Sequence, residues 1–366
     1  MKITILALQK FGAAPLCALE FSDALCRHGV AHDVVVSSAN ERLAAFSDNA
    51  FRHTYPVPTF GSSGCSFLLW TFSLMRPLRL MALLVRRRPR FVFSIDFHPW
   101  LPCLILLRPL LRFQWFHATH DNPFASKEAG RPFGNWLEQF CLHFADSAFC
   151  YSEFMQCELE RARPGLGAIP LALGAYETAV CGVKPDPIYA KRRPLVACLG
   201  RIEPYKGMET FVEVVSRLRA QGIQAYFLIA GRGRMDAETL SRAQSLEVDV
   251  QQRWFSPDAF TALALVADII VLPYAQGSQS GVIALALAAG KPVVATRVGG
   301  ITEQIVDGVT GMLVEPQNPD ALAEAVGHLL AHPEERARMG ANALAVAQSR
   351  SAWNASADTF LHACHL

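Results

Sequence analysis

The chain has 366 residues, of which 51% are hydrophobic and 18% are charged, and its formal net charge is +2. This length predicts two domains, and the hydrophobic fraction excludes a disordered chain. The near balance of charges argues against a nucleic-acid partner. The ten cysteines are scattered singly without a CxxC pair, which argues against a zinc or redox motif and favours reduced thiols in a cytoplasmic protein.

The first residues, 1–8, form a short apolar run that predicts a buried strand, with a signal peptide as the alternative. Most of the apolar excess follows between Phe67 and Phe116. Arginines interrupt this stretch before any segment reaches the ~18–20 uncharged residues that a membrane-spanning helix needs.

Strand-like and helix-like segments alternate along the whole chain. In the first half we expect strands over 1–8, 33–37, 91–95, 114–119 and 147–151, with helices over 15–28 and 154–161. The range 174–194 contains three prolines and little periodicity, and it predicts an interdomain linker. In the second half we expect strands over 195–200, 226–231, 269–273 and 292–296, and a helix over 319–331. Such alternation predicts two parallel sheets covered by helices, which bind ligands at the carboxyl ends of their strands.

Two cations follow the predicted strand 195–200. Arg201 and Lys206 are five residues apart and precede a helix, so both could reach one anion beside the helix N-terminus. A diphosphate satisfies this arrangement. The alternative is two solvated surface charges.

The loop after the predicted strand 269–273 opens another helix. Its small and hydroxyl residues would expose backbone N–H donors and add hydroxyl groups, which forms a second phosphate cradle or an ordinary N-cap. Two such loops on adjacent strands predict one pyrophosphate between them. The residues concerned are Gln276, Ser278, Gln279, Ser280, Gly281 and Val282.

Short motifs recur in a fixed order through the second half of the chain. They are Gly200-Arg201 with Lys206-Gly207, Ala230-Gly231-Arg232-Gly233, Ala267-Asp268, Leu272-Pro273, Gly290-Lys291-Pro292-Val293-Val294-Ala295, Gly299-Gly300 with Glu303, and Asp307-Gly308 with Gly311. This ordered series resembles glycosyltransferase family 4. The resemblance is dense over 195–330 and loose in the first half. The pattern Pro-Tyr-x-x-x-Ser-Gln-Ser-Gly-Val is similar to a branch of bacterial surface-polysaccharide enzymes.

The resemblance implies an α/β GT-B fold with two Rossmann-like domains facing a central cleft. Residues 1–180 would form an acceptor-binding domain and 181–345 a domain that binds a nucleotide sugar. Residues 346–366 would form a C-terminal helix that packs back on the first domain. The implied activity is transfer of a sugar from a nucleoside diphosphate sugar with retention, without a metal or another cofactor.

The family also implies roles for individual residues. Arg201 and Lys206 would be catalytic, because they would hold the donor diphosphate and stabilise its developing charge. Gln276 and 278–282 would bind the phosphate and sugar. Gly231 would line the nucleotide pocket, and Phe255 belongs to the stretch whose backbone reads the base. Retention would follow from same-face attack with a phosphate oxygen as the base.

Two positions depart from the family pattern. The family usually has two glutamates eight positions apart, which contact the donor sugar and the ribose, whereas this chain has Gly277 and Leu285. Gln276, Ser278, Gln279 or Ser280 would then take over these contacts. The departure keeps a non-catalytic nucleotide-sugar-binding protein open as an alternative, and a GT-B nucleotide-sugar epimerase is a second alternative.

In the first half, Gly12 follows the first strand, where it would let the backbone approach the donor. His120 occupies the family's Thr-x-His-Asp position beside the donor sugar and would be catalytic, with Asp121 orienting the ring; the alternative is a structural histidine. Asp96 and His98 follow another strand and would line the acceptor site, or pack their loop.

Residues 67–90 combine aromatic and aliphatic side chains with a cluster of arginines. Such a segment suits an anionic membrane surface, or forms a buried helix pair with a solvated basic turn. We therefore expect a glycan or lipid-linked acceptor, peripheral membrane contact through 67–90, and a cytoplasmic protein at the inner face of the membrane.

Overall fold

A computed structural model describes residues 2–10, 12–59, 77–124 and 132–365. The chain divides into two units, one formed by Met1–Leu173 with Ala352–Leu366 and the other by Gly174–Ser351. Part of the predicted membrane-contact segment, 67–76, lies outside the described residues. None of the described helices is long and apolar enough to span a bilayer.

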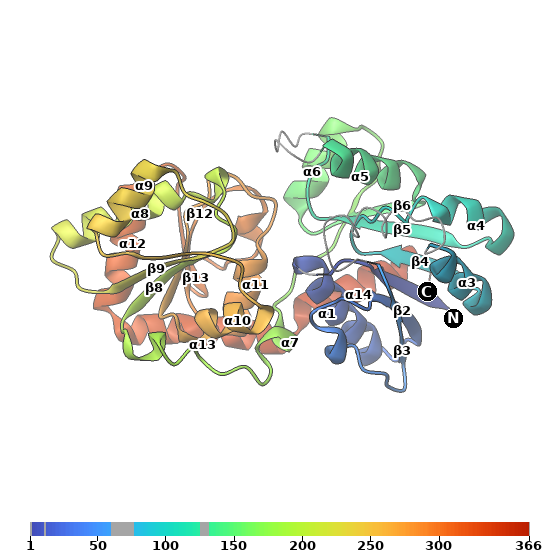
Figure 1. Cartoon of the computed structure of the whole chain (residues 1–366), viewed down its shortest axis with the longest axis horizontal. Coiled ribbons are helices and arrows are strands. Elements are labelled where there is room, and N and C mark those ends of the chain that lie inside the picture. The colour runs from blue at the N-terminus through green and yellow to red at the C-terminus, as the bar shows by residue number, and fades with distance from the viewer. Residues whose placement is uncertain (1, 11, 60–76, 125–131, 366) are drawn as a thin grey trace. The chain divides into compact units, whose positions relative to one another are not determined.

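The first unit is built around a seven-stranded parallel sheet in the order β3-β2-β1-β4-β5-β6-β7 (Figure 1). Its strands are β1 Ile3–Ala7, β2 His32–Ser37, β3 Arg52–Val57, β4 Phe91–Ser94, β5 Gln114–Thr119, β6 Ser147–Cys150 and β7 Ile169–Pro170. The helices are α1 Ala13–Arg27, α3 Pro77–Arg87, α4 Cys103–Leu111, α5 Pro132–Phe144, α6 Glu153–Ala162 and α14 Ser351–Ala363.

Side chains on β4 and β5 alternate between the two faces of this sheet. Phe93 and Phe116 pack against Phe360 of α14, with ring centroids 4.8 and 5.6 Å apart. Val92 and Trp115 belong to the core that contains the buried leucines of α3 and α4. The last helix of the chain therefore completes the core of the first unit.

The second unit has a six-stranded parallel sheet in the order β10-β9-β8-β11-β12-β13. Its strands are β8 Leu195–Leu199, β9 Tyr226–Gly231, β10 Asp249–Gln252, β11 Ile269–Leu272, β12 Val293–Thr296 and β13 Gly311–Val314. The helices are α7 Glu177–Val180, α8 Met208–Ala220, α9 Ala237–Ser245, α10 Pro257–Val266, α11 Gly281–Ala288, α12 Pro319–Ala331 and α13 Pro333–Ser349.

Local sequence explains these elements. The four residues of β11 are aliphatic and fully buried, as expected for a central parallel strand. Pro319 begins α12, and the Asn318 side chain accepts a hydrogen bond from the backbone N–H of Ala321, which caps the helix. Asp268 fixes the start of the sheet, because its carboxylate accepts a hydrogen bond from Leu195 N–H at 2.7 Å. Two parallel sheets covered by helices confirm the predicted α/β fold.

Candidate active site

The strand order of the second unit changes direction between β8 and β11. Loops that leave adjacent strands at such a switch point separate and leave a crevice at the carboxyl edge of the sheet. The loops after β8 and β11 carry most of the predicted site residues. The topology therefore brings these residues to one edge.

Arg201 and Lys206 lie on the loop after β8 beside two tyrosines. The Lys206 Nζ is 3.7 Å from the centroid of the Tyr274 ring, a cation–π contact with the loop after β11. The Arg201 Nη2 donates a hydrogen bond to the Tyr205 hydroxyl at 2.8 Å. The two loops are also joined by a hydrogen bond of 2.8 Å from Ala275 N–H to the Tyr205 carbonyl. The guanidinium group is exposed and the lysine is half-buried, so both cations are held at the surface of one loop pair.

Two glycines permit this close approach of the loops. A Cβ atom built on Gly207, whose φ is +71°, would lie 1.9 Å from the Pro273 carbonyl oxygen. A Cβ built on Gly231, at the end of β9, would collide with the Gly200 carbonyl oxygen. No side chain fits at either position. These glycines set the spacing between the loops after β8, β9 and β11.

The N-terminus of α11 is ordered by Ser280. Its hydroxyl accepts a hydrogen bond from Val282 N–H at 3.3 Å and lies 3.2 Å from the Tyr274 hydroxyl. Gln304 forms two hydrogen bonds with the backbone of the same residue. Its Oε1 accepts from Ser280 N–H at 2.7 Å, and its Nε2 donates to the Ser280 carbonyl at 3.2 Å. Burial raises the pKa of Tyr274 well above its ordinary value, so the phenol remains protonated. A helix N-terminus capped in this way can bind an anion.

The remaining residues of this loop, Gln276, Ser278, Gln279 and Gly281, lie beside the same helix tip and are at least partly exposed. Gly277 leaves room for a side chain, because a built Cβ would meet Ile301 and Tyr274 only at 3.5 Å. Leu285 is 5% exposed and packs inside the unit. The two positions where the family has glutamates thus differ, because Gly277 admits a Cβ atom in ordinary van der Waals contact and Leu285 is part of the core.

Phe255 follows β10, the edge strand beside β9. The Arg253 guanidinium lies 3.9 Å from the centroid of the Phe255 ring. The loop after β9 is joined to the end of β10 by a hydrogen bond of 2.8 Å from Met235 N–H to the Gln252 side chain. Gly231 and Phe255 therefore lie on two neighbouring loops, on the β9 side of the two cations.

In the first unit, three predicted residues follow β1 and β4. Gly12 is exposed, has a φ of +98° and precedes α1, and a Cβ built on it would meet nothing within 4 Å. Asp96 is half-buried. His98 is 1% exposed, and its Nδ1 accepts a hydrogen bond from Trp100 N–H at 3.2 Å. Burial lowers the pKa of His98 to about 3, so this ring is neutral and shapes its loop.

His120 and Asp121 follow β5. The His120 ring stacks on Tyr151 with centroids 4.5 Å apart, and it forms a hydrogen bond with the Ile95 backbone. Burial lowers the pKa of His120, and the carboxylates of Asp121 and Glu138 oppose that shift. Asp121 is exposed. The imidazole is thus a fixed group at the carboxyl edge of the sheet, and its Nε2 is buried.

A buried hydrogen-bond chain lies beneath His120. His117 bonds Ser94 through Nδ1 at 2.7 Å and Glu138 through Nε2 at 3.3 Å, and the Trp115 indole donates to Ser94 at 2.9 Å. These side chains are buried, which indicates a structural role. Within the described ranges, no group of three or more His, Cys, Asp or Glu residues is arranged to hold a metal ion.

Four ordering residues were not predicted as part of the site. Tyr205 and Tyr274 support the two cations, Gln304 fixes the α11 tip, and Tyr151 supports His120. The tyrosine in the Pro273-Tyr274 motif was visible in the sequence. Gln304 gave no local signal, because its partner is 24 positions away.

Two family models match the chain. A model described as "Glycosyl transferases group 1" matches residues 185–346, and one described as "Glycosyl transferase 4-like domain" matches residues 12–166. Among curated proteins, an alpha-D-kanosaminyltransferase of Streptomyces kanamyceticus is 34% identical over 169 residues, which are 45% of this chain and 44% of that protein. A GDP-mannose-dependent alpha-(1-6)-phosphatidylinositol monomannoside mannosyltransferase of Mycolicibacterium smegmatis is 35% identical over 159 residues, or 40% and 41% of the two chains. The chain spans less than half the length of these relatives.

Solved structures share the whole fold at low identity. A sucrose-phosphate synthase from Thermosynechococcus elongatus has a TM-score of 0.72 at 20% identity and covers 100% of this chain and 98% of its own. The Anabaena protein HepE, solved in complex with UDP and glucose, has a TM-score of 0.69 at 18% identity, with 100% and 99% covered. Together with the two family models, which match both units, the GT-B architecture identifies this chain as a member of glycosyltransferase family 4.

Proposed function

We propose that the protein is a retaining, metal-independent glycosyltransferase that moves a sugar from a nucleoside diphosphate sugar to a glycan or lipid-linked acceptor. One observation carries the proposal. Lys206 on the loop after β8 contacts Tyr274, which contacts the Ser280 cap of α11, while Arg201 lies on the same loop as Lys206. Two cations and a helix N-terminus beside each other form a site for a diphosphate.

The chemistry follows from this charge distribution. The bond between the anomeric carbon and the diphosphate oxygen breaks, and its electron pair goes to the diphosphate. The acceptor hydroxyl forms the new bond on the same face and gives its proton to the departing diphosphate oxygen. Arg201, Lys206 and the α11 N–H groups stabilise the charge that develops on the leaving group, which is commonly the largest contribution to catalysis.

In this proposal the second unit holds the donor and the first binds the acceptor. Gly231 and Phe255 contact the nucleoside, while Gln276, Gly281 and 278–280 contact the phosphate and sugar. Gly12, His120 and Asp121 serve the donor sugar from the first unit, and Asp96 with His98 shape the acceptor site. The relatives named for GDP-mannose or kanosamine transfer support this class of substrate. A role in bacterial polysaccharide synthesis on the cytoplasmic face of the membrane completes the proposal.

The test compares alanine variants of the two cations with matched surface controls. UDP-glucose, UDP-N-acetylglucosamine and GDP-mannose are first screened for thermal stabilisation, since a ligand at 100 times its Kd adds ~2.7 kcal/mol. We expect Arg201→Ala and Lys206→Ala to lower release of the nucleoside diphosphate by ~10²-fold or more. The controls are Lys184→Ala and Arg338→Ala, both at exposed positions of the same unit. Turnover unchanged in both site variants would exclude this mechanism, and the anomeric configuration of the product, read by NMR, tests retention.

A second candidate is a nucleotide-sugar-binding protein without transferase activity. Gly277 and Leu285 favour it, because neither side chain can bond a sugar or ribose hydroxyl. Donor binding that depends on Arg201 and Lys206, with no diphosphate release for any acceptor tried, would support this candidate. Conversion of the nucleotide sugar without an acceptor would indicate an epimerase.

A further inference from the structure

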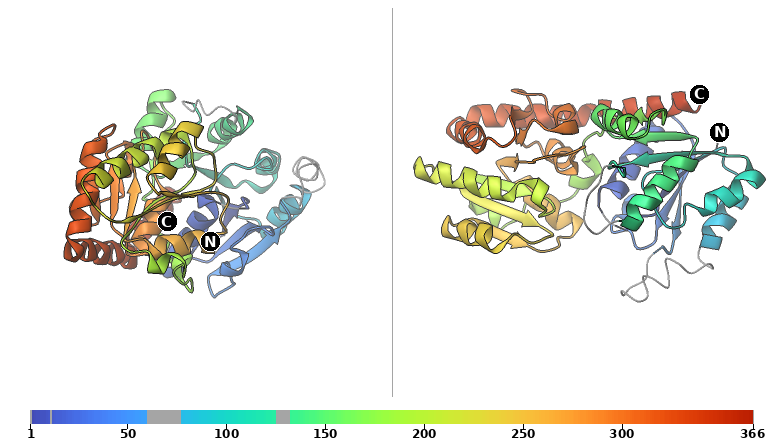
Figure 2. Two further views of the ribbon diagram at one scale, coloured as in Figure 1. Left: turned by 60° about the vertical axis from the view of Figure 1, so that its left-hand side comes forward. Right: turned by 90° about the horizontal axis from the view of Figure 1, so that it is seen from above.

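Helices α3, α4 and α5 cover one face of the first sheet, opposite α14 (Figure 2). Their inner sides contribute buried residues such as Leu84, Leu104 and Cys141 to a single core. Their outer sides are unusually apolar. Large hydrophobic side chains exposed there, with their exposed fractions, are Leu78 48%, Val85 38%, Leu106 72%, Leu110 70%, Phe133 51%, Trp136 54% and Phe144 37%.

The aromatic residues of α5 form a continuous row along that helix. The ring centroids are 5.9 Å apart for Phe133 and Trp136, 5.7 Å for Trp136 and Phe140, and 4.7 Å for Phe140 and Phe144. The spacing of three and four residues places them on one helical face. Burial in the core does not explain this row, because three of its four members are exposed.

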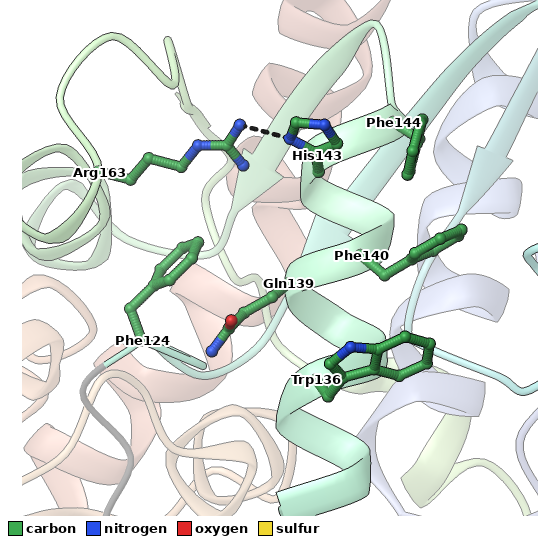
Figure 3. A pocket seen from close by; sticks show the side chains of 7 residues that line it. All are labelled: Phe124, Trp136, Gln139, Phe140, His143, Phe144 and Arg163. Carbon is green, nitrogen blue, oxygen red and sulfur yellow. Dashed lines mark hydrogen bonds between the residues drawn. The ribbon is translucent and has the colours of Figure 1, made fainter.

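A pocket of about 310 Å³ lies against this row (Figure 3). Its other walls include Phe124, Gln139 and Arg163. The Arg163 guanidinium points across the pocket to His143, with 2.8 Å between Nη2 and Nδ1. The face therefore offers aromatic surface, a recess between side chains and a cation at its margin.

Charge on the three helices is mainly positive. They contain four arginines, Arg79, Arg86, Arg87 and Arg108, and one carboxylate, Glu138. Glu138 is 6% exposed and bonds the buried His117, so it does not contribute to the outer surface. Arg87 is paired with Asp33, and Arg108 is paired with Asp146 just after α5. The positive charge beside the exposed apolar side chains therefore rests on the exposed Arg79 and Arg86.

We propose that the outer face of α3, α4 and α5 is a docking surface for an anionic lipid bilayer. Trp and Phe side chains partition into the interfacial layer of a membrane, and arginines with long aliphatic stems keep their charge among the headgroups. Anionic headgroups complement the exposed Arg79 and Arg86 of this face. This inference does not depend on the donor site, because every residue that carries it belongs to the first unit.

The test uses the full chain and vesicles of defined composition in a co-sedimentation assay. We expect binding to phosphatidylcholine vesicles with 30% phosphatidylglycerol, much weaker binding to phosphatidylcholine alone, and loss of binding in 0.5 M NaCl. Arg79→Gln and Arg86→Gln should each weaken binding about 5-fold, as ~1 kcal/mol per arginine implies. Trp136→Glu, and the pair Leu106→Glu with Leu110→Glu, should weaken it at least 10-fold.

The matched control is Ile188→Glu, an apolar position of the second unit with an exposed fraction (64%) between those of Trp136 and Leu110, which should bind like the wild type. All substituted side chains are exposed, and the melting temperature of each variant verifies its folding. Absence of wild-type binding to anionic vesicles would overturn the proposal, as would equal binding by Trp136→Glu and the control. A dimer of the lipid-free protein that Trp136→Glu dissociates would assign the face to self-association and also overturn it.

Discussion

Gly207 offers a sharp test of the idea that the spacing of two loops governs the site. A methyl group in Gly207→Ala would lie 1.9 Å from the Pro273 carbonyl oxygen, and real Cβ contacts are not shorter than 3.0 Å. The loops after β8 and β11 must therefore separate by about 1 Å, a displacement that can reduce a reaction rate by ~10²-fold. We expect that loss in donor turnover, together with a decrease in the free energy of unfolding of about 1 kcal/mol for the left-handed backbone and about 1–3 kcal/mol for the collision.

The matched control is Gly222→Ala. Gly222 has a φ of +75°, close to the +71° of Gly207, but a Cβ built on it would meet nothing within 4 Å. Gly222→Ala should therefore lower the free energy of unfolding by only about 1 kcal/mol, the cost of the left-handed backbone, and it should retain full turnover. Urea denaturation and initial rates of diphosphate release measure both quantities. Equal behaviour of the two variants in both assays would refute the reasoning, because only Gly207 lies between the loops.

Three further predictions concern stability. Ser280→Ala should lower the free energy of unfolding by ~1 kcal/mol through loss of the α11 cap and by ~1–3 kcal/mol because the Tyr274 hydroxyl is left unsatisfied. Adding Tyr274→Phe should recover part of the second loss. Strictly additive losses of the two variants, measured by hydrogen exchange over 281–288, would contradict the coupling. Gly277→Glu should fold normally, because Gly277 is partly exposed and a Cβ built on it would meet its neighbours only at 3.5 Å. Leu285→Glu should lower the free energy of unfolding by roughly 3 kcal/mol or more, because it buries a carboxylate. Similar melting temperatures of the two variants would argue against this assignment. The folded-state pKa of His98 is lowered to about 3 from an ordinary 6.5, so the unfolded chain takes up a proton first as the pH falls. The free energy of unfolding should therefore decrease by about 2 kcal/mol between pH 8 and pH 5. Urea titrations at both pH values should show a smaller decrease in the free energy of unfolding for His98→Asn than for the wild type. The same pH dependence in both proteins would count against a neutral buried ring.

Much of the fold could be predicted because buried parallel strands consist of consecutive aliphatic residues. The expected strand 114–119 and helix 319–331 coincide with β5 and α12. Other elements were not predicted, such as β10 (Asp249–Gln252), in which three of the four residues are polar and all four are only half-buried at the edge of the sheet. The expected linker 174–194 contains the short helix α7 and belongs to the second unit. Polar edge strands and single helical turns carry too little periodicity to be recognised.

The candidate site was partly visible for a similar reason. Arg201 and Lys206 stand out because they follow a strand and precede a helix, which local sequence reveals. Several motif residues instead support the scaffold: Asp268 anchors the start of β8, and the close approach of Gly311 to Val293 allows β13 to pair with β12. The residues that order the cations and the helix tip depend on contacts between separate loops. Sequence alone gives no distance between such loops.

The packing of Phe360 against Phe93 and Phe116 has a consequence for biosynthesis. The described strands of the first unit all precede Gly174, but α14, which shares one face of their sheet with α1, is made only after the second unit. The second unit, contiguous from Gly174 to Ser351, can fold completely before that moment. The first unit can therefore complete its core only after the second unit has been synthesised, and a nascent chain that stalls before α14 would expose part of a phenylalanine-rich sheet face to chaperones and proteases.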